Sequence, residues 1–180
     1  MILTPTNETG VAIERQKFIL DHIHANPLGS FVFSGPPGVG KTTLLRELER
    51  CSRAARWKNH PVYFATMMEF QRVTTAKSNG AIAYGVTADG LRDMASRGCK
   101  YSLFFDDFDK VRGTEFIRLH LLEIVNAAVE TDAQLGLTTN MTKAEFAKFF
   151  ADTVYWRIAR HCTWVEIARE SSNPAQAAAA

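Results

Sequence analysis

Short runs of consecutive apolar residues alternate along the chain with segments in which apolar residues recur every three or four positions. The short runs predict buried strands, and the longer period predicts helices with one apolar face. Strands that alternate with helices in this way form a parallel sheet that needs a helical layer on each face. The sequence therefore predicts an α/β fold with a five-stranded parallel sheet, whose strands cover residues 31–33, 61–66, 101–105, 132–139 and 163–167.

The predicted helices lie before and between these strands. Ile19 and Ile23 are four positions apart in a first helix expected over residues 8–25. The stretch between the second strand and residue 91 has no clear period and is ambiguous. Further helices are indicated by Leu44, Leu45, Leu48 and Cys51, by residues 91–95 ahead of Gly98, by Ile117, Leu121, Ile124 and Ala128, and by the capping-box pair Thr142 and Glu145 ahead of Phe146, Phe149 and Phe150.

A glycine-rich loop joins the first strand to the helix that follows it. Residues 35–42 read Gly-Pro-Pro-Gly-Val-Gly-Lys-Thr and satisfy every fixed position of the phosphate-loop pattern. The glycines let backbone N–H groups approach phosphate oxygens, and the helix adds its unpaired N–H donors. Lys41 is expected to contact the β- and γ-phosphates of ATP, and Thr42 to bind Mg²⁺ through its hydroxyl group. The predicted ATP-binding residues are Gly35, Pro36, Pro37, Gly38, Val39, Gly40, Lys41, Thr42 and Thr43.

Two carboxylates follow the third strand, at the edge where open α/β sheets bind ligands. Asp106 is expected to hold Mg²⁺ directly or through water. Asp107 is expected to orient or deprotonate the water that attacks the γ-phosphate. The alternative is a solvated acidic loop, because Asp109 follows closely. The phosphate loop favours the catalytic interpretation.

The phosphate loop, the paired acids and the sequence Leu-Thr-Thr-Asn at residues 137–140 together resemble the AAA+ ATPases. The resemblance is closest to the branch that contains bacterial replicative helicase loaders of the DnaC type and transposition helper ATPases of the IstB type. Those families commonly have Asp-Asp where most AAA+ enzymes have Asp-Glu. The resemblance implies that Asn140 is the first sensor of the γ-phosphate.

In this branch an arginine between the sensor strand and the last core strand reaches into the ATP site of the neighbouring subunit. Arg157 is at the matching position, and Arg160 is the competing residue. Such an arginine neutralises the charge that develops on the transferred phosphoryl group and couples hydrolysis to assembly. The alternative for either residue is a surface ion pair.

AAA+ proteins usually continue into a helical lid with a second sensor arginine, whereas this sequence stops a few residues after its last predicted strand. We expect an AAA+ nucleotide-binding domain over residues 1–170 without an evident C-terminal lid, and a disordered tail at residues 171–180. The lid is either absent or truncated. In both cases we expect weak ATP turnover without a partner or an oligomer.

Composition narrows the class of protein further. A chain that is 46% hydrophobic and 22% charged suits one globular domain, and its net charge of +2 decides nothing about a nucleic-acid partner. Scattered cysteines, and the lack of a secretory or membrane-spanning run, predict reduced thiols and a cytoplasmic location. The histidines have no ligand-spaced partners, so no metal besides Mg²⁺ is implied.

Basic residues concentrate between the second and third strands, where DNA-contacting elements occur in the resembling family. Basic side chains on one track would bind single-stranded DNA through its phosphates, with little sequence preference. A solvated basic face is an equally good interpretation. The residues are Arg72, Lys77, Arg92, Arg97 and Lys100.

Together these positions predict an oligomeric ATPase that acts on DNA through a helicase or transposase partner. The alternative is an interaction protein that uses ATP binding as an assembly switch and turns over little. A small-molecule phosphotransferase is disfavoured, because Asn140 follows a strand and the sequence has no arginine-rich phosphate lid.

Overall fold

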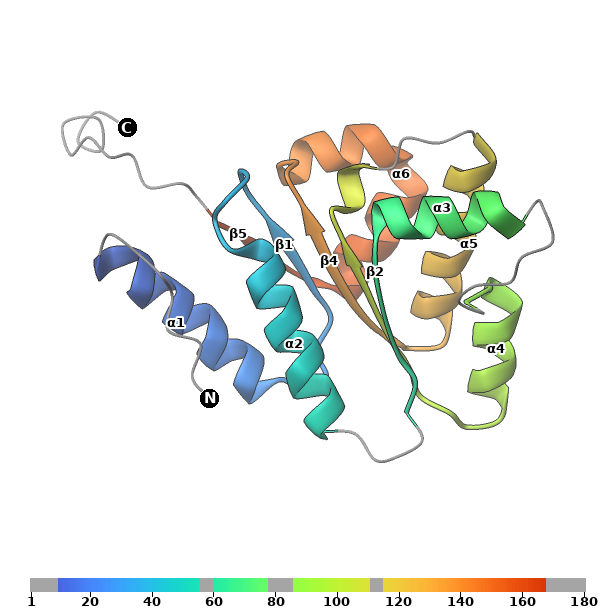
Figure 1. The fold of residues 1–180 in the computed structure, drawn as a ribbon, viewed down its shortest axis with the longest axis horizontal. Coiled ribbons are helices and arrows are strands. Elements are labelled where there is room, and N and C mark those ends of the chain that lie inside the picture. Colours follow the sequence, from blue (N-terminus) through green and yellow to red (C-terminus); the bar gives the residue numbers. More distant parts are fainter. Residues whose placement is uncertain (1–9, 56–59, 78–85, 111–114, 168–180) are drawn as a thin grey trace.

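Five parallel strands form one sheet in the order β2-β3-β4-β1-β5 (Figure 1). The computed structural model describes residues 10–55, 60–77, 86–110 and 115–167, so the predicted tail at residues 171–180 lies outside the described residues. The predicted five-stranded parallel sheet is confirmed, and each strand lies within about two residues of its predicted bounds. The strands are β1 (Phe31–Ser34), β2 (Val62–Thr66), β3 (Ser102–Asp106), β4 (Gln134–Thr139) and β5 (Thr163–Glu166).

Helices cover both faces of the sheet, as predicted (Figure 1). Side chains alternate between the two faces along a strand. Phe31 and Phe33 therefore pack under the first two helices, while Val32 faces the other four. Each such buried side chain contributes about 1.5–3 kcal/mol. The helices are α1 (Gly10–Ala25), α2 (Lys41–Ala55), α3 (Met67–Lys77), α4 (Ala88–Ser96), α5 (Glu115–Glu130) and α6 (Lys143–His161), and a 3₁₀ turn, η1, covers Phe108–Lys110.

Helix α3 covers the first part of the stretch that has no clear period in the sequence. It begins directly after β2 because Thr66 and Glu69 form a capping box. The backbone N–H of Thr66 donates to Glu69 Oε2 at 2.9 Å, and the backbone N–H of Glu69 donates to Thr66 Oγ1 at 3.2 Å. The predicted capping box of Thr142 and Glu145 is also present at the start of α6. Within the described ranges, every helix is too short or too polar to span a lipid bilayer.

A buried carboxylate lies where α1 packs against α2. Glu47 accepts hydrogen bonds from Arg50 at 2.6 and 2.8 Å, and His24 Nε2 lies 2.7 Å from Glu47 Oε1. The bonds from Arg50 are the main reason that the pKa of Glu47 falls to about 2. His24, Glu47 and Cys51 bring possible metal-ligand atoms within 4.8 Å of one another, which the sequence spacing does not reveal. Arg50, however, engages both carboxylate oxygens.

We expect the Glu47→Gln substitution to destabilise the fold at pH 7 by about 2 kcal/mol, because a neutral amide cannot balance the guanidinium of Arg50. The stabilisation by Glu47 is complete above its unfolded pKa of 4.5 and is lost as the pH falls through about 2. Melting temperatures of the wild type and the Glu47→Gln variant between pH 7 and pH 3 measure this stabilisation. The difference between the two melting temperatures should shrink below pH 4.5. Glu123→Gln, which removes a carboxylate that is 65% exposed, should change little; a difference that is independent of pH would contradict the charge argument.

Candidate nucleotide-binding site

The carboxyl ends of three neighbouring strands meet at one edge of the sheet. Strand β4 lies between β1 and β3, and all three run parallel. The loop after β1, the acids at the end of β3 and Asn140 after β4 therefore come together, although they are far apart in the sequence. Parallel sheets bind ligands outside the carboxyl ends of their strands. The topology thus brings Lys41, Asp106 and Asn140 to one site.

The phosphate loop turns sharply between β1 and α2. Gly35, Gly38 and Gly40 have φ angles of 145°, 85° and 88°, which favour glycine. Pro37 and Gly38 line the cavity above the loop, whereas Pro36 and Val39 do not. Together with its neighbours, the loop encloses a cavity of about 440 Å³, which is lined by Pro37, Gly38, Gly40, Lys41, Thr42, Thr43, Asp107, Lys110 and Asn140.

Lys41 is the first residue of α2, and only 7% of it is exposed. Its ammonium group donates to the carbonyl oxygens of Gly35 and Pro36 at 2.7 and 2.8 Å, and to Asn140 Oδ1 at 2.9 Å. Burial lowers the pKa of Lys41, while the nearby aspartates act in the opposite direction. None of the three direct acceptors is charged, so an anion in the cavity would give the buried ammonium a charged partner in direct contact.

Asp106 and Thr42 place oxygen ligands side by side. The hydroxyl group of Thr42 donates to both carboxylate oxygens of Asp106, each at 3.1 Å. Thr138 on β4 also donates to Asp106, at 2.6 Å, and so fixes the carboxylate. Hydroxyl and carboxylate oxygens are the ligands that Mg²⁺ prefers. The residues present therefore fit the predicted magnesium site, and Thr138 supports it although the sequence did not single it out.

Asp107 lines the cavity and is held from two sides. Its backbone N–H donates to Thr138 Oγ1 at 2.8 Å, and its φ angle of 57° lies in the left-handed region. Lys110 Nζ donates to Asp107 Oδ2 at 2.6 Å. Lys110 is a site residue that the sequence analysis missed. The sequence signal that could have identified it is a basic residue three positions after Asp107.

Asp109 does not behave as a solvated acid. Its carboxylate accepts the backbone N–H of Asn140 at 2.9 Å and the side-chain N–H of Asn140 at 3.1 Å. With its amide nitrogen held there, Asn140 turns its amide oxygen to Lys41. Asp109, which motivated the acidic-loop interpretation, instead orients the predicted sensor.

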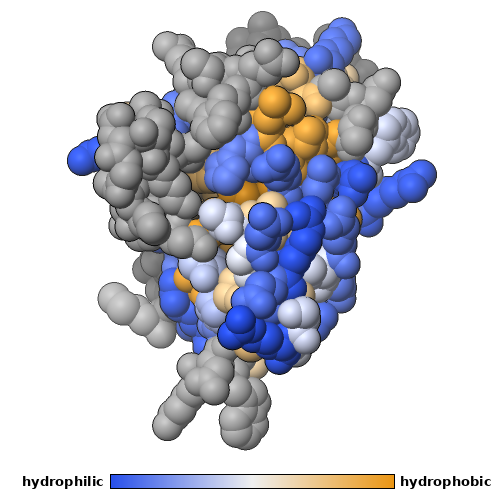
Figure 2. Space-filling view, turned by 90° about the vertical axis from the view of Figure 1, so that its right-hand side faces the viewer, coloured by the Kyte–Doolittle hydropathy of each residue, from blue (hydrophilic) through white to orange (hydrophobic). Residues whose placement is uncertain are grey.

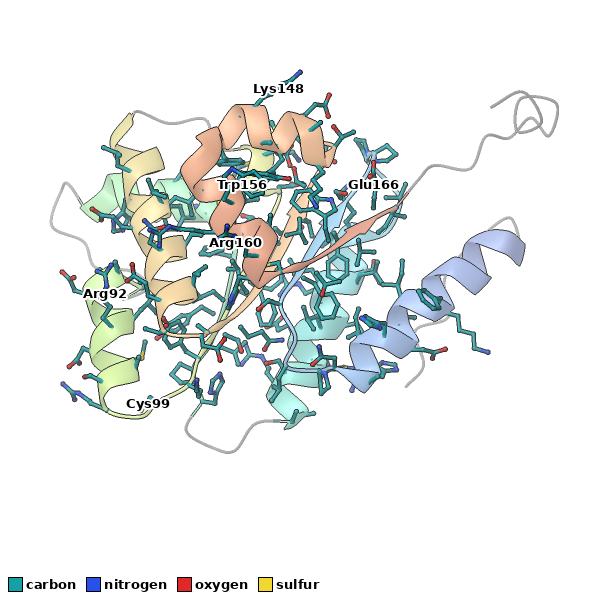
Figure 3. The ribbon with its side chains drawn as sticks, turned by 180° about the vertical axis from the view of Figure 1, so that it is seen from behind. Arg92, Cys99, Lys148, Trp156, Arg160 and Glu166 are labelled. Atoms are coloured by element: carbon teal, nitrogen blue, oxygen red, sulfur yellow. The ribbon has the colours of Figure 1, made fainter. Side chains whose placement is uncertain are left out.

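Neither candidate arginine reaches this cavity. Arg157 Nη1 lies 3.7 Å from Glu130 Oε1, and Arg160 makes no ion pair with the described residues. Both belong to the last part of α6, which leads into β5; Figure 3 places Arg160 beside that connection. Since Thr163 pairs with Phe31, β5 begins at the edge opposite the phosphate loop. A role of either arginine at a neighbouring subunit stays a prediction.

The basic residues between β2 and β3 do not form one track. Arg92 pairs with Glu130 at 3.2 Å and Arg97 pairs with Asp93 at 2.8 Å. Arg92 belongs to α4 and Arg97 directly follows it, whereas Arg72 belongs to α3, which lies above α4 in Figure 1. The described residues on that side are largely hydrophilic, with an apolar area in the upper part (Figure 2).

Two further basic residues complete this set. Lys100 lies 3.8 Å from Asp132, and the side chain of Lys77 lies outside the described part of the chain. The ion pairs of Arg92, Arg97 and Lys100 favour the solvated-face interpretation for these three residues.

The parallel sheet, the glycine loop around a buried lysine and the strand-end acids define a P-loop nucleoside triphosphatase with an AAA+ fold. The family model described as "ATPase family associated with various cellular activities (AAA)" matches residues 31–151, which is more than half of the chain. The chain belongs to this family of ATPases, as the sequence resemblance predicted. Comparison with curated protein sequences gives no significant match.

Several solved structures share the fold at low sequence identity. The DnaC helicase loader superposes with a TM-score of 0.65 and 17% identity, over 89% of this chain and 93% of that one. DnaA from Aquifex aeolicus with AMPPCP gives 0.63 and 18%, over 93% and 51%. DnaA bound to AMPPCP and single-stranded DNA gives 0.64 and 18%, over 94% and 52%. The chain thus spans about half the length of these DnaA structures.

Proposed function

We propose that this chain binds ATP and Mg²⁺ in the strand-end cavity and hydrolyses the nucleotide. The observation that carries the proposal is the buried ammonium of Lys41, which faces the cavity with neutral acceptors alone. A triphosphate supplies negatively charged acceptors in direct contact with Lys41. Thr42 and Asp106 offer oxygen ligands for Mg²⁺, which neutralises phosphate charge when bound.

The other cavity residues then have distinct roles. Asp107 orients or deprotonates the attacking water, and Asn140 contacts the γ-phosphate. Thr43 lines the cavity next to Thr42 and contacts the α-phosphate. Asp109 is a positioning residue that acts through Asn140. The fixed hydrogen bonds of Asp106 and Asn140 prepare the site before nucleotide arrives, which is how such sites stabilise a transition state.

We propose further that the chain forms an ATP-dependent oligomer and acts on DNA through a partner, as a helicase loader or transposition helper does. Similarity to the DnaC helicase loader, and to a DnaA structure that contains single-stranded DNA, supports this role. The position of Arg157, outside its own cavity, leaves it available to a neighbour's nucleotide. Arg160 has the same opportunity.

One observation favours a second candidate function, an assembly switch with little turnover. Lys110 donates to Asp107 Oδ2 at 2.6 Å, so in this arrangement an attacking water competes with an ammonium group for the carboxylate. A protein in which this pair persists would bind ATP and assemble without rapid hydrolysis.

Phosphate release by an Asp107→Asn variant separates the two functions. We expect the variant to bind ATP normally and to lose about a hundredfold or more in turnover, because an amide cannot accept the proton of the attacking water. Asp89→Asn, which changes a carboxylate that is 99% exposed, is the control. The mass of the assembly with and without ATP and single-stranded DNA is measured in parallel. Assembly with unaltered phosphate release would favour the switch, and a mass that ATP does not change would contradict the proposed oligomer.

A further inference from the structure

The cavity contains a second cation besides Lys41. Lys110 lines the same space as Lys41, Thr42 and Asn140, and its ammonium group lies 2.6 Å from Asp107 Oδ2. The two lysines differ in how they are held. Lys41 is buried among three acceptors, whereas the side chain of Lys110 is 51% exposed and bonds to one carboxylate. One cation of the cavity is therefore fixed, and the other can reorient.

The simplest interpretation of this contact is a local ion pair. Lys110 and Asp107 are three residues apart, and the backbone N–H of Lys110 donates to the carbonyl oxygen of Asp107 at 2.8 Å, so the turn brings the two together. Exposed pairs of this kind contribute little to stability. A weakly held ammonium can therefore exchange its carboxylate for a more highly charged anion at little cost.

The backbone of Asp107 is anchored. Its N–H is bonded to Thr138 Oγ1, so the residue keeps its place directly after β3. If the pair separates, the long side chain of Lys110 has the greater reach, and Asp107 remains a cavity residue. The terminal phosphate of a nucleoside triphosphate carries more charge than one carboxylate and attracts an ammonium more strongly.

We propose that Lys110 is a second phosphate-binding residue of this cavity, which contacts the terminal phosphate of ATP and releases Asp107 as it does so. This inference rests on the proposed ATP site and adds a specificity to it. ADP lacks the terminal phosphate, so Lys110 stays on Asp107 when ADP is bound. The same side chain thereby distinguishes ATP from ADP and keeps the carboxylate engaged until a triphosphate arrives.

The test compares the affinities of wild type, Lys110→Met and Lys110→Arg for ATP and for ADP, each with Mg²⁺, by calorimetry. We expect Lys110→Met to weaken ATP binding about tenfold, the effect of one charge-assisted contact, and to change ADP binding less than about twofold. Lys110→Arg should restore most of the preference for ATP. Lys100→Met is the matched control, because Lys100 is 60% exposed and lies outside the cavity.

An ATP-to-ADP affinity ratio that Lys110→Met leaves unchanged would overturn the inference, because a turn-stabilising ion pair has no reason to distinguish the two nucleotides. Melting temperatures check that each variant is folded, and the ratio for Lys110→Gln replaces that for Lys110→Met if the latter unfolds. Failure of the wild type to bind ATP would overturn the proposed function as well. Normal wild-type binding with an unchanged ratio would overturn the role of Lys110 alone.

Discussion

The Lys41→Ala variant is expected to bind ATP about a hundredfold more weakly than the wild type, which corresponds to roughly 3 kcal/mol. Lys41 is held in place before any ligand is present, because it donates to Gly35, Pro36 and Asn140. Phosphate oxygens therefore meet a positioned ammonium that carries little residual entropy. The alanine side chain leaves the backbone N–H donors of the loop in place but removes the positive charge of the ammonium group.

Calorimetric titration of ATP with Mg²⁺ measures this effect, and Lys148→Ala is the matched control. Lys148 is exposed on α6 and lies away from the cavity lining (Figure 3). Because Lys41 also stabilises the loop in the absence of ligand, the melting temperature of the variant is recorded without nucleotide. Equal ATP affinities for the Lys41→Ala variant and the wild type, with both proteins folded, would remove the basis for the proposed site.

The sequence predicted those parts of the site that depend on local patterns. Eight consecutive residues are enough to recognise the phosphate loop. A short apolar run that ends in Asp106 and Asp107 is enough to recognise a strand with acids at its end. The strand bounds were predicted closely because consecutive buried residues are a local signal. Leu45 and Leu48 were predicted from the helical period of apolar residues, which is also a local signal, and both are buried.

The residues that organise the site escaped prediction because their partners are distant in the chain. Thr138 contacts Asp106 only because β4 lies next to β3, and the order of the strands is not a local property. Asp109 looked like one more exposed acid until the fold brought Asn140 to it. Helix α3 was missed for another reason: the spacing of Thr66 and Glu69 was readable as a capping box, but no apolar period followed it.

Arg157 shows a limit of a different kind. Its proposed partner is the nucleotide of a second subunit, so neither the sequence nor the structure of one chain contains the contact. The 3.7 Å approach to Glu130 is long for a strong ion pair, and the side chain is 40% exposed. Leaving Glu130 would therefore cost little. A side chain whose ion pair within its own subunit is weak can leave that pair to contact the nucleotide of a neighbouring subunit. Weak ion pairing is also the property that distinguishes Lys110 from Lys41 inside the cavity.

The Gly35→Ala substitution is expected to destabilise the fold by about 3 kcal/mol, which lowers the melting temperature by roughly 10 °C. The φ angle of 145° is unfavourable for alanine, and a Cβ atom would lie 2.2 Å from the carbonyl oxygen of Ile167. Backbone hydrogen bonds hold both sides of this contact. Gly35 donates to the carbonyl oxygen of Thr139 at 3.3 Å, and the N–H of Ile167 donates to Ser34 at 2.7 Å, so the start of the loop is clamped between β4 and β5.

Gly38→Ala is the matched control in the same loop. Gly38 also has a positive φ angle, 85°, but a Cβ atom there would meet no atom of the described residues within 4 Å. It should cost only the backbone strain, about 1 kcal/mol. Melting both variants without nucleotide separates strain from the clash with β5. Equal losses would show that strain alone decides the requirement for glycine; a larger loss for Gly35→Ala would show that the end of β5 fixes the origin of the phosphate loop.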